Sequence, residues 1–394
     1  MSERVHIGVF GKCNAGKSTL INAILNQDLI ITSPIPGTTT DPVYKSIELY
    51  GLGPCLLADT AGFDELGHLG AKRLKKSKIV AAKTDIAIII FSGKNIDHEI
   101  EWLNLFQKNE VDVYPVINSF GDFNGDASLA DAIRKSAGRE PIILNAFARE
   151  GVDDFISMLA ADYADKMERR SITGKLAAEG DLVLLIMPQD IQAPQGRLIL
   201  PQVQVLRDLL DKKAVVVSAT TDKMEDALKV LSSAPKLIIT DSQAFKKVYD
   251  LKPAESMLTS FSVLMAGYKG DINEYISGAD ALEHLNGNSN ILIAEACSHK
   301  PLNEDIGRIQ IPRMLRNKFG NKIQIKVCAG NDFPDDLSLF DLIIQCGGCM
   351  FNRKNMLSRI KRARACGVPI TNYGIVIAKM TGILEKISFN TIKE

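Results

Sequence analysis

Short apolar runs alternate with amphipathic stretches in the first part of the chain, from Val5 to about Leu159. The runs have the length of strands and are nearly continuous, which is typical of parallel strands buried on both faces. Most of the intervening stretches have the spacing of amphipathic helices. We therefore predict a parallel sheet covered by helices on both faces. Residues 43–50 alternate instead, which predicts an edge strand beside residues 55–60.

The pattern changes between residues 162 and 180, where charged and small residues replace the apolar periodicity. We expect a linker or an exposed helix there. Two further α/β blocks follow, and the first of them, with roughly 80 residues and three strands, is small for an independently stable domain. Its sheet edge or a helix face is therefore expected to pair with a second copy. The predicted divisions are residues 1–165, a linker at 166–180, residues 181–258 and residues 259–394.

The charge of the chain is balanced, with 47 basic and 47 acidic residues among 394. A neutral protein gives no bulk electrostatic reason to expect nucleic acid or a membrane as its partner. The first residues lack the longer apolar core of a signal peptide, and no apolar run approaches about 18 residues. We expect a cytoplasmic protein, in which the seven cysteines are mostly reduced thiols or metal ligands rather than disulfides.

A phosphate-binding loop is predicted directly after the first apolar run. Residues 11–18 read GKCNAGKS and fit the pattern G-x-x-x-x-G-K-[ST], with a strand pattern before them and a helical pattern after them. In such a loop backbone N–H groups surround the phosphates, Lys17 reaches the outer phosphates and Ser18 holds Mg²⁺. The predicted phosphate-binding residues are Gly11, Asn14, Ala15, Gly16, Lys17, Ser18 and Thr19.

Two later elements favour a GTPase over an ATPase. Residues 34–41 form a Thr-rich loop where a switch loop would reach Mg²⁺, and DTAG at residues 59–62 closes an apolar run. The phosphate loop, the Thr-rich loop and the DTAG segment resemble, in their order and spacing, the motifs of the Era/MnmE-like branch of bacterial GTPases. The first switch loop of that branch reads G-T-T-x-D. The matching residues are Gly37, Thr38, Thr39 and Asp41, of which Thr38 is expected to contact the nucleotide. The predicted catalytic residues are Lys17, Thr39, Asp59 and Gly62, and the predicted Mg²⁺ ligands are Ser18, Thr39 and Asp59.

Phe63 follows Gly62, at the position where many GTPases carry the Gln that orients the attacking water. An apolar side chain cannot orient water, so we expect slow unaided hydrolysis. The resemblance offers a remedy, because in potassium-activated members of this branch an Asn at the position of Asn14 helps to hold K⁺ against the phosphates. Alternatively, Asn14 only fills a turn.

Base recognition departs from the GTPase pattern. These proteins normally carry N-K-x-D after a late strand, with the Asp accepting hydrogen bonds from guanine. Here VINSFGD places Asn118 first, Ser119 where Lys belongs, and Asp122 one residue late. Asn145 and Ala146 stand where S-A-x is expected. We predict that Asn118, Asp122, Asn145 and Ala146 contact the nucleotide, with weakened selectivity for guanine.

Candidate metal ligands follow two apolar runs in the last block. Cys297 and His299 end one run, and Cys346 and Cys349 end another. If the two runs are neighbouring parallel strands, their carboxyl ends meet at one crevice, the usual place for ligands in open α/β sheets. Three kinds of site fit these residues: a structural Cys₃His zinc site, a 4Fe–4S cluster on the three cysteines with a weakly ligated or open fourth iron, or a redox cysteine pair.

The order of the motifs resembles the HydF family, the maturation factors of iron-iron hydrogenases. The resemblance rests on the GTPase part followed by residues 193–211, 259–271 and 305–315, together with the EACSH and CGGC segments. It implies an α/β fold with an N-terminal P-loop GTPase doubly wound sheet followed by two smaller α/β domains. The implied domains are a GTPase domain (1–165), a dimerisation domain (181–258) and an iron-sulfur cluster-binding domain (259–394).

The resemblance also implies a function. Members of this family are GTP-hydrolysing scaffolds that bind a 4Fe–4S cluster and deliver the diiron subcluster precursor of the hydrogenase H-cluster to apo-FeFe-hydrogenase. The implied cofactors are a 4Fe–4S cluster, GTP and Mg²⁺, with K⁺ as a further candidate. The implied partners are a second copy of the chain, apo-FeFe-hydrogenase and two radical-SAM maturases, and the GTP state is implied to regulate these partner interactions.

The metal motif of the family, C-x-H followed by H-C-x-x-C, is matched here by Cys297, His299, Cys346 and Cys349. Gln345 stands where the family has its second His. This position therefore cannot supply a His ligand, and an open or exchangeable fourth site is favoured. His299 either fills that site transiently or only donates a hydrogen bond near it.

Four other cysteines, Cys13, Cys55, Cys328 and Cys366, are predicted to be packing residues. Two alternative functions stay open. One is a GTPase with a structural Cys₃His zinc domain that acts in RNA-related or ribosome-related assembly, and the balanced charge counts against it. The other is a GTP-driven redox enzyme, against which counts the lack of a C-x-x-x-C-x-x-C radical motif and of a flavin fingerprint.

Overall fold

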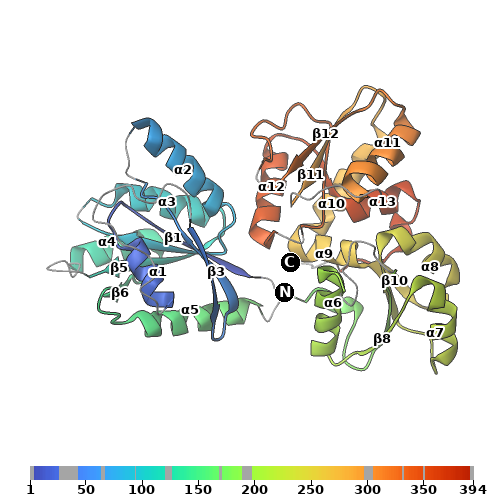
Figure 1. Ribbon diagram of the computed structural model, residues 1–394, viewed down its shortest axis with the longest axis horizontal. Helices are drawn as coiled ribbons and strands as arrows, with labels where there is room; N and C mark the ends of the chain where they lie inside the picture. The colour runs from blue at the N-terminus through green and yellow to red at the C-terminus, as the bar shows by residue number, and fades with distance from the viewer. Residues whose placement is uncertain are drawn as a thin grey trace. The chain divides into compact units, whose positions relative to one another are not determined.

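The computed structural model divides the chain into two compact units, which we call the N-terminal unit (residues 2–169) and the C-terminal unit (mainly residues 170–394) (Figure 1). Within the described residues, no helix is both long enough and apolar enough to cross a membrane. The structure describes residues 4–25, 43–63, 67–93, 95–119, 127–167, 171–188, 198–296, 305–330, 332–348 and 351–390.

The N-terminal unit is built on one sheet with the strand order β2-β3-β1-β4-β5-β6. The pairs are parallel except at β2, which runs antiparallel to β3 at the edge, as its alternating pattern predicted. The apolar run that forms β4 is buried along its whole length, which explains its lack of alternation. The strands are β1 (Val5–Gly11), β2 (Val43–Leu49), β3 (Gly53–Asp59), β4 (Ile86–Phe91), β5 (Asp112–Asn118) and β6 (Ile142–Leu144).

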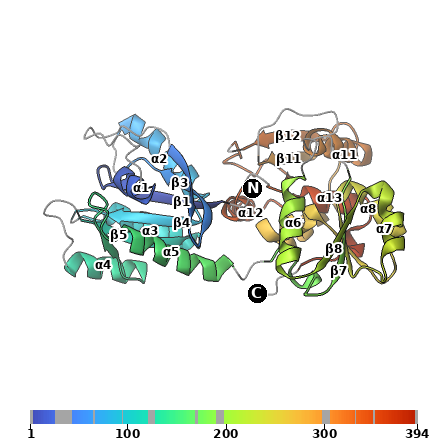
Figure 2. The ribbon, with the colours of Figure 1, turned by 60° about the horizontal axis from the view of Figure 1, so that its bottom comes forward.

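Helices cover both faces of this sheet (Figure 2). One apolar core joins the sheet to α1 and α5, and a second core on the opposite face joins it to α2, α3 and α4. The predicted doubly wound α/β architecture is thereby confirmed. The helices are α1 (Lys17–Leu25), α2 (Gly67–Ala81), α3 (Asp97–Lys108), α4 (Ala127–Ala137) and α5 (Val152–Met167).

The C-terminal unit contains two parallel sheets of four strands each, ordered β10-β9-β7-β8 and β12-β11-β13-β14. The sequence predicted three strands in each, and the structure adds the short strands β10 and β14. Both precede an apolar helix directly, so their residues merge into the helical pattern in the sequence. The strands are β7 (Leu182–Ile186), β8 (Val215–Ala219), β9 (Leu237–Thr240), β10 (Met257–Ser260), β11 (Asn290–Glu295), β12 (Gln324–Ala329), β13 (Leu342–Gln345) and β14 (Ile370–Asn372).

One hydrophobic core extends through both sheets of this unit, from Leu184 on β7 to Ile293 on β11. The predicted boundary between residues 258 and 259 falls inside β10, so these two blocks form one compact unit in the structure. The helices are α6 (Leu200–Asp211), α7 (Met224–Val230), α8 (Phe245–Leu251), α9 (Phe261–Lys269), α10 (Ile272–Asp280), α11 (Ile311–Phe319), α12 (Arg353–Ala365) and α13 (Tyr373–Met380).

Residues 171–180, expected to belong to an exposed linker, pack against the C-terminal unit instead. Ile172 and Leu176 are buried in the core beside α6 and α9. The carboxylate of Asp208 accepts hydrogen bonds from the backbone N–H groups of Ile172 and Thr173, both at 2.9 Å. Most residues of this stretch are charged or small, so the sequence pattern did not indicate that Ile172 and Leu176 are buried.

His6 on β1 makes the stability of the N-terminal unit depend on pH. Burial, and then the nearby charges of Lys83 and Arg4, lower the pKa of its imidazole to about 4. The folded state favours the neutral imidazole. The free energy of unfolding therefore has its full value above about pH 6.5 and decreases as the pH falls toward 4. We expect a loss of up to about 2 kcal/mol, since the side chain is partly exposed. Urea unfolding at pH 7.5 and at pH 5.0, monitored by Trp102 fluorescence, measures this loss of unfolding free energy.

Trp102 is the only tryptophan in the chain and lies in this unit, so the signal reports this unit alone. A His6→Gln variant is the control, and its unfolding free energy should change less between the two pH values. An equal change in both proteins would contradict the role of His6.

Candidate functional site

The predicted phosphate loop lies between the end of β1 at Gly11 and the start of α1 at Lys17. Asn14 has a positive φ of 59°, which Asn tolerates better than most residues, and its side chain is exposed. Gly16 has a φ of +91°, and a Cβ there would lie 2.2 Å from the Asn118 amide nitrogen. The loop conformation therefore requires glycine at position 16.

Three residues predicted to hold the outer phosphates and Mg²⁺, namely Lys17, Ser18 and Asp59, lie together. The Lys17 ammonium donates to the carbonyl oxygens of Gly11 at 3.1 Å and Lys12 at 2.6 Å, so it lies against the loop. The Ser18 hydroxyl donates to Asp59 Oδ2 at 2.6 Å. Burial raises the pKa of Asp59, while Ser18 and Lys17 oppose this shift.

Asp59 Oδ1 is buried without a hydrogen-bond partner among the described residues. A carboxylate oxygen left in this state beside a hydroxyl is suited to a hard cation, so these residues fit Mg²⁺. Thr38 and Thr39, predicted to complete the site, lie outside the described residues.

The Phe63 side chain is buried in an aromatic cluster. Its ring stacks on Trp102 of α3 with 5.6 Å between centroids and 16° between planes. Trp102 in turn stacks on Phe10 at 5.4 Å and contacts Phe106 at 5.8 Å. The side chain after Gly62 therefore packs in the core instead of facing the nucleotide, which agrees with the expectation that it orients no water.

Asn118 connects the phosphate loop to the loop after β6. Its amide group donates to the Ala15 carbonyl at 3.4 Å and accepts from the Ala146 N–H at 3.0 Å. The Ser119 hydroxyl, which replaces the usual Lys, donates to the Leu144 carbonyl at 3.1 Å. Three residues predicted to contact the nucleotide, Ala15, Asn118 and Ala146, thus lie together.

Of the other two predicted base contacts, the structure describes only Asn145. The Asn145 side chain accepts from the Ala148 N–H at 3.0 Å, within its own turn. Asp122 lies outside the described residues, so the selectivity for guanine stays a prediction.

An ion pair between the phosphate loop and α3 was not expected from the sequence pattern. Lys12 Nζ lies 3.1 Å from Glu99 Oε2, and the Glu99 side chain is fully buried. Burial raises the pKa of Glu99, an effect that Lys12 opposes. Lys12 occupies a variable position of the motif, so only the fold identifies this contact.

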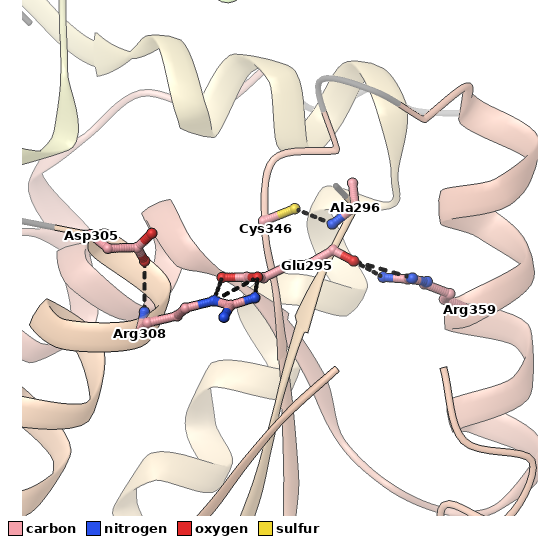
Figure 3. Close-up of polar contacts among 6 residues, drawn as sticks. All are labelled: Glu295, Ala296, Asp305, Arg308, Cys346 and Arg359. Carbon is pink, nitrogen blue, oxygen red and sulfur yellow. Dashed lines mark hydrogen bonds and ion pairs between the residues drawn. The ribbon is translucent and has the colours of Figure 1, made fainter. Parts of the chain in front are cut away.

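The predicted metal site starts from two neighbouring strands. β11 and β13 are parallel, with Ala294 opposite Gln345, so their carboxyl ends meet as expected. Cys346 Sγ accepts a hydrogen bond from the backbone N–H of Ala296 at 3.1 Å (Figure 3). It accepts a second one from the backbone N–H of Gly348 at 3.4 Å. Amide donors to sulfur are a usual feature of iron-sulfur ligation, so this cysteine fits such a cluster.

The described residues contain no group of three His, Cys, Asp or Glu side chains arranged for a metal ion. Of the four predicted ligands only Cys346 is described, since Cys297, His299 and Cys349 lie outside the described ranges. Gln345 is fully buried, and its amide donates to the Tyr275 hydroxyl. The position of the missing His is thus part of the core.

An ion pair joins a residue that precedes the segment 297–304 to a residue that follows it. Glu295, the last residue of β11, is 3% exposed at its side chain and binds the Arg308 guanidinium at 2.8 Å. Asp305 accepts from the Arg308 N–H at 2.7 Å, and Arg359 donates to the Glu295 carbonyl at 3.4 Å (Figure 3). These contacts join the residues that come before and after the segment of Cys297. Sequence reasoning missed these residues because isolated charges usually indicate a solvated surface.

The remaining cysteines only partly follow the prediction that they pack. Cys55 and Cys328 are buried, as predicted, and burial raises the pKa of Cys55 to about 11. Cys13 is half-buried in the phosphate loop. Cys366 is exposed after the end of α12, so its predicted packing role is wrong.

Curated proteins that are similar to part of this chain are GTPases. The tRNA modification GTPase MnmE of Rhodopseudomonas palustris is 29% identical over 219 residues, which cover 52% of this chain and 44% of that protein. GTPase Der of Myxococcus xanthus is 26% identical over 186 residues, covering 44% of this chain and 40% of that protein. The chain thus spans less than half the length of these curated relatives.

A structure of Era in complex with MgGDPNP and nucleotides 1506–1542 of 16S ribosomal RNA is 25% identical, with a TM-score of 0.36. It covers 41% of this chain and 57% of the Era chain.

Three family models match successive parts of the chain. Residues 6–119 match the 50S ribosome-binding GTPase model, and GTP and Mg²⁺ are consistent with such a domain. Residues 172–270 match the hydrogen maturase F dimerization domain, and residues 273–388 match the hydrogen maturase F tetramerization domain. With an Era/MnmE-like P-loop GTPase followed by both of these domains, the chain belongs to the hydrogen maturase F (HydF) family.

Proposed function

We propose that this protein is a GTP-hydrolysing scaffold that binds a 4Fe–4S cluster and carries the diiron subcluster precursor to apo-FeFe-hydrogenase. The main support for this proposal is the environment of the Cys346 thiol. Its sulfur accepts hydrogen bonds from two backbone N–H groups where the carboxyl ends of β11 and β13 meet. It lies within the segment that matches a hydrogen maturase F domain, which supports hydrogenase maturation over an RNA-related role.

In the GTPase part, Ser18, Thr39 and Asp59 would hold Mg²⁺, and Lys17 would hold the outer phosphates. The Gly62 N–H would respond to the γ-phosphate. Asp59 already accepts from Ser18, so two of these ligands need little rearrangement. Hydrolysis contributes a conformational free-energy difference that regulates partner association, including the two radical-SAM maturases.

In the cluster part, Cys297, Cys346 and Cys349 would supply three thiolate ligands. A cluster bound in this way offers an iron with an exchangeable coordination site for the precursor. Gln345 is held in the core by Tyr275 and supplies no ligand. His299 remains a candidate for the exchangeable position.

Anaerobic reconstitution with iron and sulfide, followed by EPR of the reduced protein, tests the central proposal. We expect about four irons per chain and the signal of a reduced 4Fe–4S cluster. A colourless protein that binds only zinc would refute the proposal and favour the structural Cys₃His site.

Potassium is expected to accelerate GTP hydrolysis. Asn14 is exposed on the phosphate loop, so its side chain is accessible to an ion bound beside the phosphates. Turnover should be faster in K⁺ than in Na⁺ buffer at equal ionic strength, and Asn14→Ala should remove the difference. Equal rates in both buffers would leave Asn14 as a turn residue only.

The dimerization segment carries an exposed apolar surface on α6 and the neighbouring edge strand β8. Val203 and Leu210 lie seven residues apart on α6 and are 41% and 54% exposed, and Val215 on β8 is 55% exposed. β8 lies at the end of its sheet, where unpaired backbone groups can receive another strand. These elements therefore support the proposed pairing with a second copy.

Leu210→Asp should dissociate the dimer. A carboxylate buried in an apolar interface without a partner costs about 3 kcal/mol or more, which weakens association by roughly 100-fold or more. Light scattering across a concentration series measures the change. Val230→Asp is the matched control, because Val230 is 80% exposed on another helix, α7, and is not one of the residues of this surface. Equal dimerisation of both variants would place the interface elsewhere.

A further inference from the structure

Two cations, the buried Lys269 and the half-buried Arg353, connect the dimerization segment to the cysteine loop. Lys269 is the last residue of α9, one residue before the end of the segment that matches the dimerization domain. Arg353 is the first residue of α12, directly after the loop that contains the C-x-x-C pattern. Both belong to the C-terminal unit, and neither is part of a recognised sequence motif.

Lys269 is 2% exposed, and its ammonium is directed at the backbone of the cysteine loop. It donates to the Gly348 carbonyl at 3.0 Å and to the Phe351 carbonyl at 2.9 Å. These two carbonyls lie on either side of residues 349–350. Gly348 has a φ of +65°, and a Cβ there would lie 2.5 Å from Met356 Sδ, so this turn favours glycine at position 348.

Arg353 makes the reciprocal contact. Its guanidinium donates to the carbonyls of Tyr268 at 2.8 Å and Gly270 at 2.6 Å, at the end of α9. The last carbonyls of a helix lack partners within the helix and are favourable sites for a cation. Each segment therefore contributes one cation that binds the backbone of the other.

We propose that Lys269 and Arg353 form a clamp that positions the cysteine loop for its cluster, and that the charge of Lys269 favours the reduced cluster. The proposal rests on the proposed cluster-binding function. A buried positive charge stabilises the extra negative charge that a cluster carries after one-electron reduction. Because α9 packs against α6, which carries the apolar dimer surface, the clamp also connects that surface to the cluster loop.

Lys269→Met tests the clamp, with Lys252→Met as the matched control. Lys252 also donates to three backbone carbonyls, those of Pro253, Ala254 and Ser256, but contacts no cysteine segment. After reconstitution, Lys269→Met should release iron to a chelator about tenfold or more faster than the wild type. In a dithionite titration its cluster should accept the electron at a more negative potential. Lys252→Met should match the wild type in both measurements.

Two conservative variants separate geometry from charge. Lys269→Arg keeps the charge and should keep a potential close to that of the wild type. Arg353→Lys keeps a cation but cannot reach the same carbonyls with a planar fork, so it should lose iron faster at an unchanged potential. If Lys269→Met does not fold, Arg353→Lys and Lys269→Arg still give the test. Wild-type iron release in the variants that fold would overturn the clamp.

A measurement without metal separates this proposal from the proposed function. In the apo-protein, backbone hydrogen exchange of a peptide that spans residues 346–356 should be faster in Lys269→Met or Arg353→Lys than in the wild type. Unchanged exchange would overturn the clamp. A wild-type chain that takes up no cluster would refute the cluster function, whereas faster exchange in the variants would still show that the clamp orders the loop.

Discussion

Replacing Cys346 with alanine is expected to abolish binding of a 4Fe–4S cluster while GTP hydrolysis continues at the wild-type rate. Cys346 lies where the carboxyl ends of β11 and β13 meet, and two backbone N–H groups are already directed at its sulfur. Two remaining cysteines cannot replace a third thiolate at that position. The GTPase residues belong to the other compact unit, so their geometry does not depend on this side chain.

Iron and sulfide content after reconstitution, together with GTP turnover, measure both effects. Cys366→Ala is the matched control, because Cys366 is an exposed thiol in the same unit and should not affect cluster binding. If Cys346→Ala retained a full cluster, Cys346 would not be a ligand. If GTP turnover fell together with iron content, the two units would be coupled more tightly than we propose.

Replacing Asp59 with asparagine is expected to reduce GTP turnover by about 100-fold or more and to leave cluster content unchanged. Removing a Mg²⁺ ligand costs several kcal/mol of charge stabilisation, and each 1.4 kcal/mol corresponds to about a tenfold change in rate. The amide can still accept a hydrogen bond from Ser18, which in the wild type donates to Asp59 at 2.6 Å. The variant should therefore fold, and its defect should be catalytic.

Turnover at saturating GTP across a Mg²⁺ titration measures this effect, and Trp102 fluorescence reports the folding of the unit. Asp162→Asn is a suitable control in the same unit, because Asp162 binds Tyr114 and Arg139 and contacts no predicted nucleotide residue. Full turnover in Asp59→Asn would remove Asp59 from the Mg²⁺ site. A loss of cluster content in this variant would contradict the separation of the two activities.

Much of the fold could be predicted because it depends on local patterns. Continuous apolar runs such as β4 indicate parallel strands buried on both faces, and the alternation in β2 indicates an edge. The short strands β10 and β14 could not be predicted, since four and three residues do not establish a period. The segment at 171–180 was also misjudged, because its two buried anchors, Ile172 and Leu176, do not form a repeat.

The sequence by itself determined the position of the phosphate loop, the closeness of Ser18 to Asp59, and the meeting of two strand ends at Cys346. Motif spacing and the geometry of parallel sheets are sufficient for these conclusions. Only the tertiary structure decided that Phe63 stacks on Trp102 and that Lys269 binds the carbonyls beside the cysteines. A buried ring or cation is stabilised by groups distant in sequence, and the packing of the chain alone brings them together.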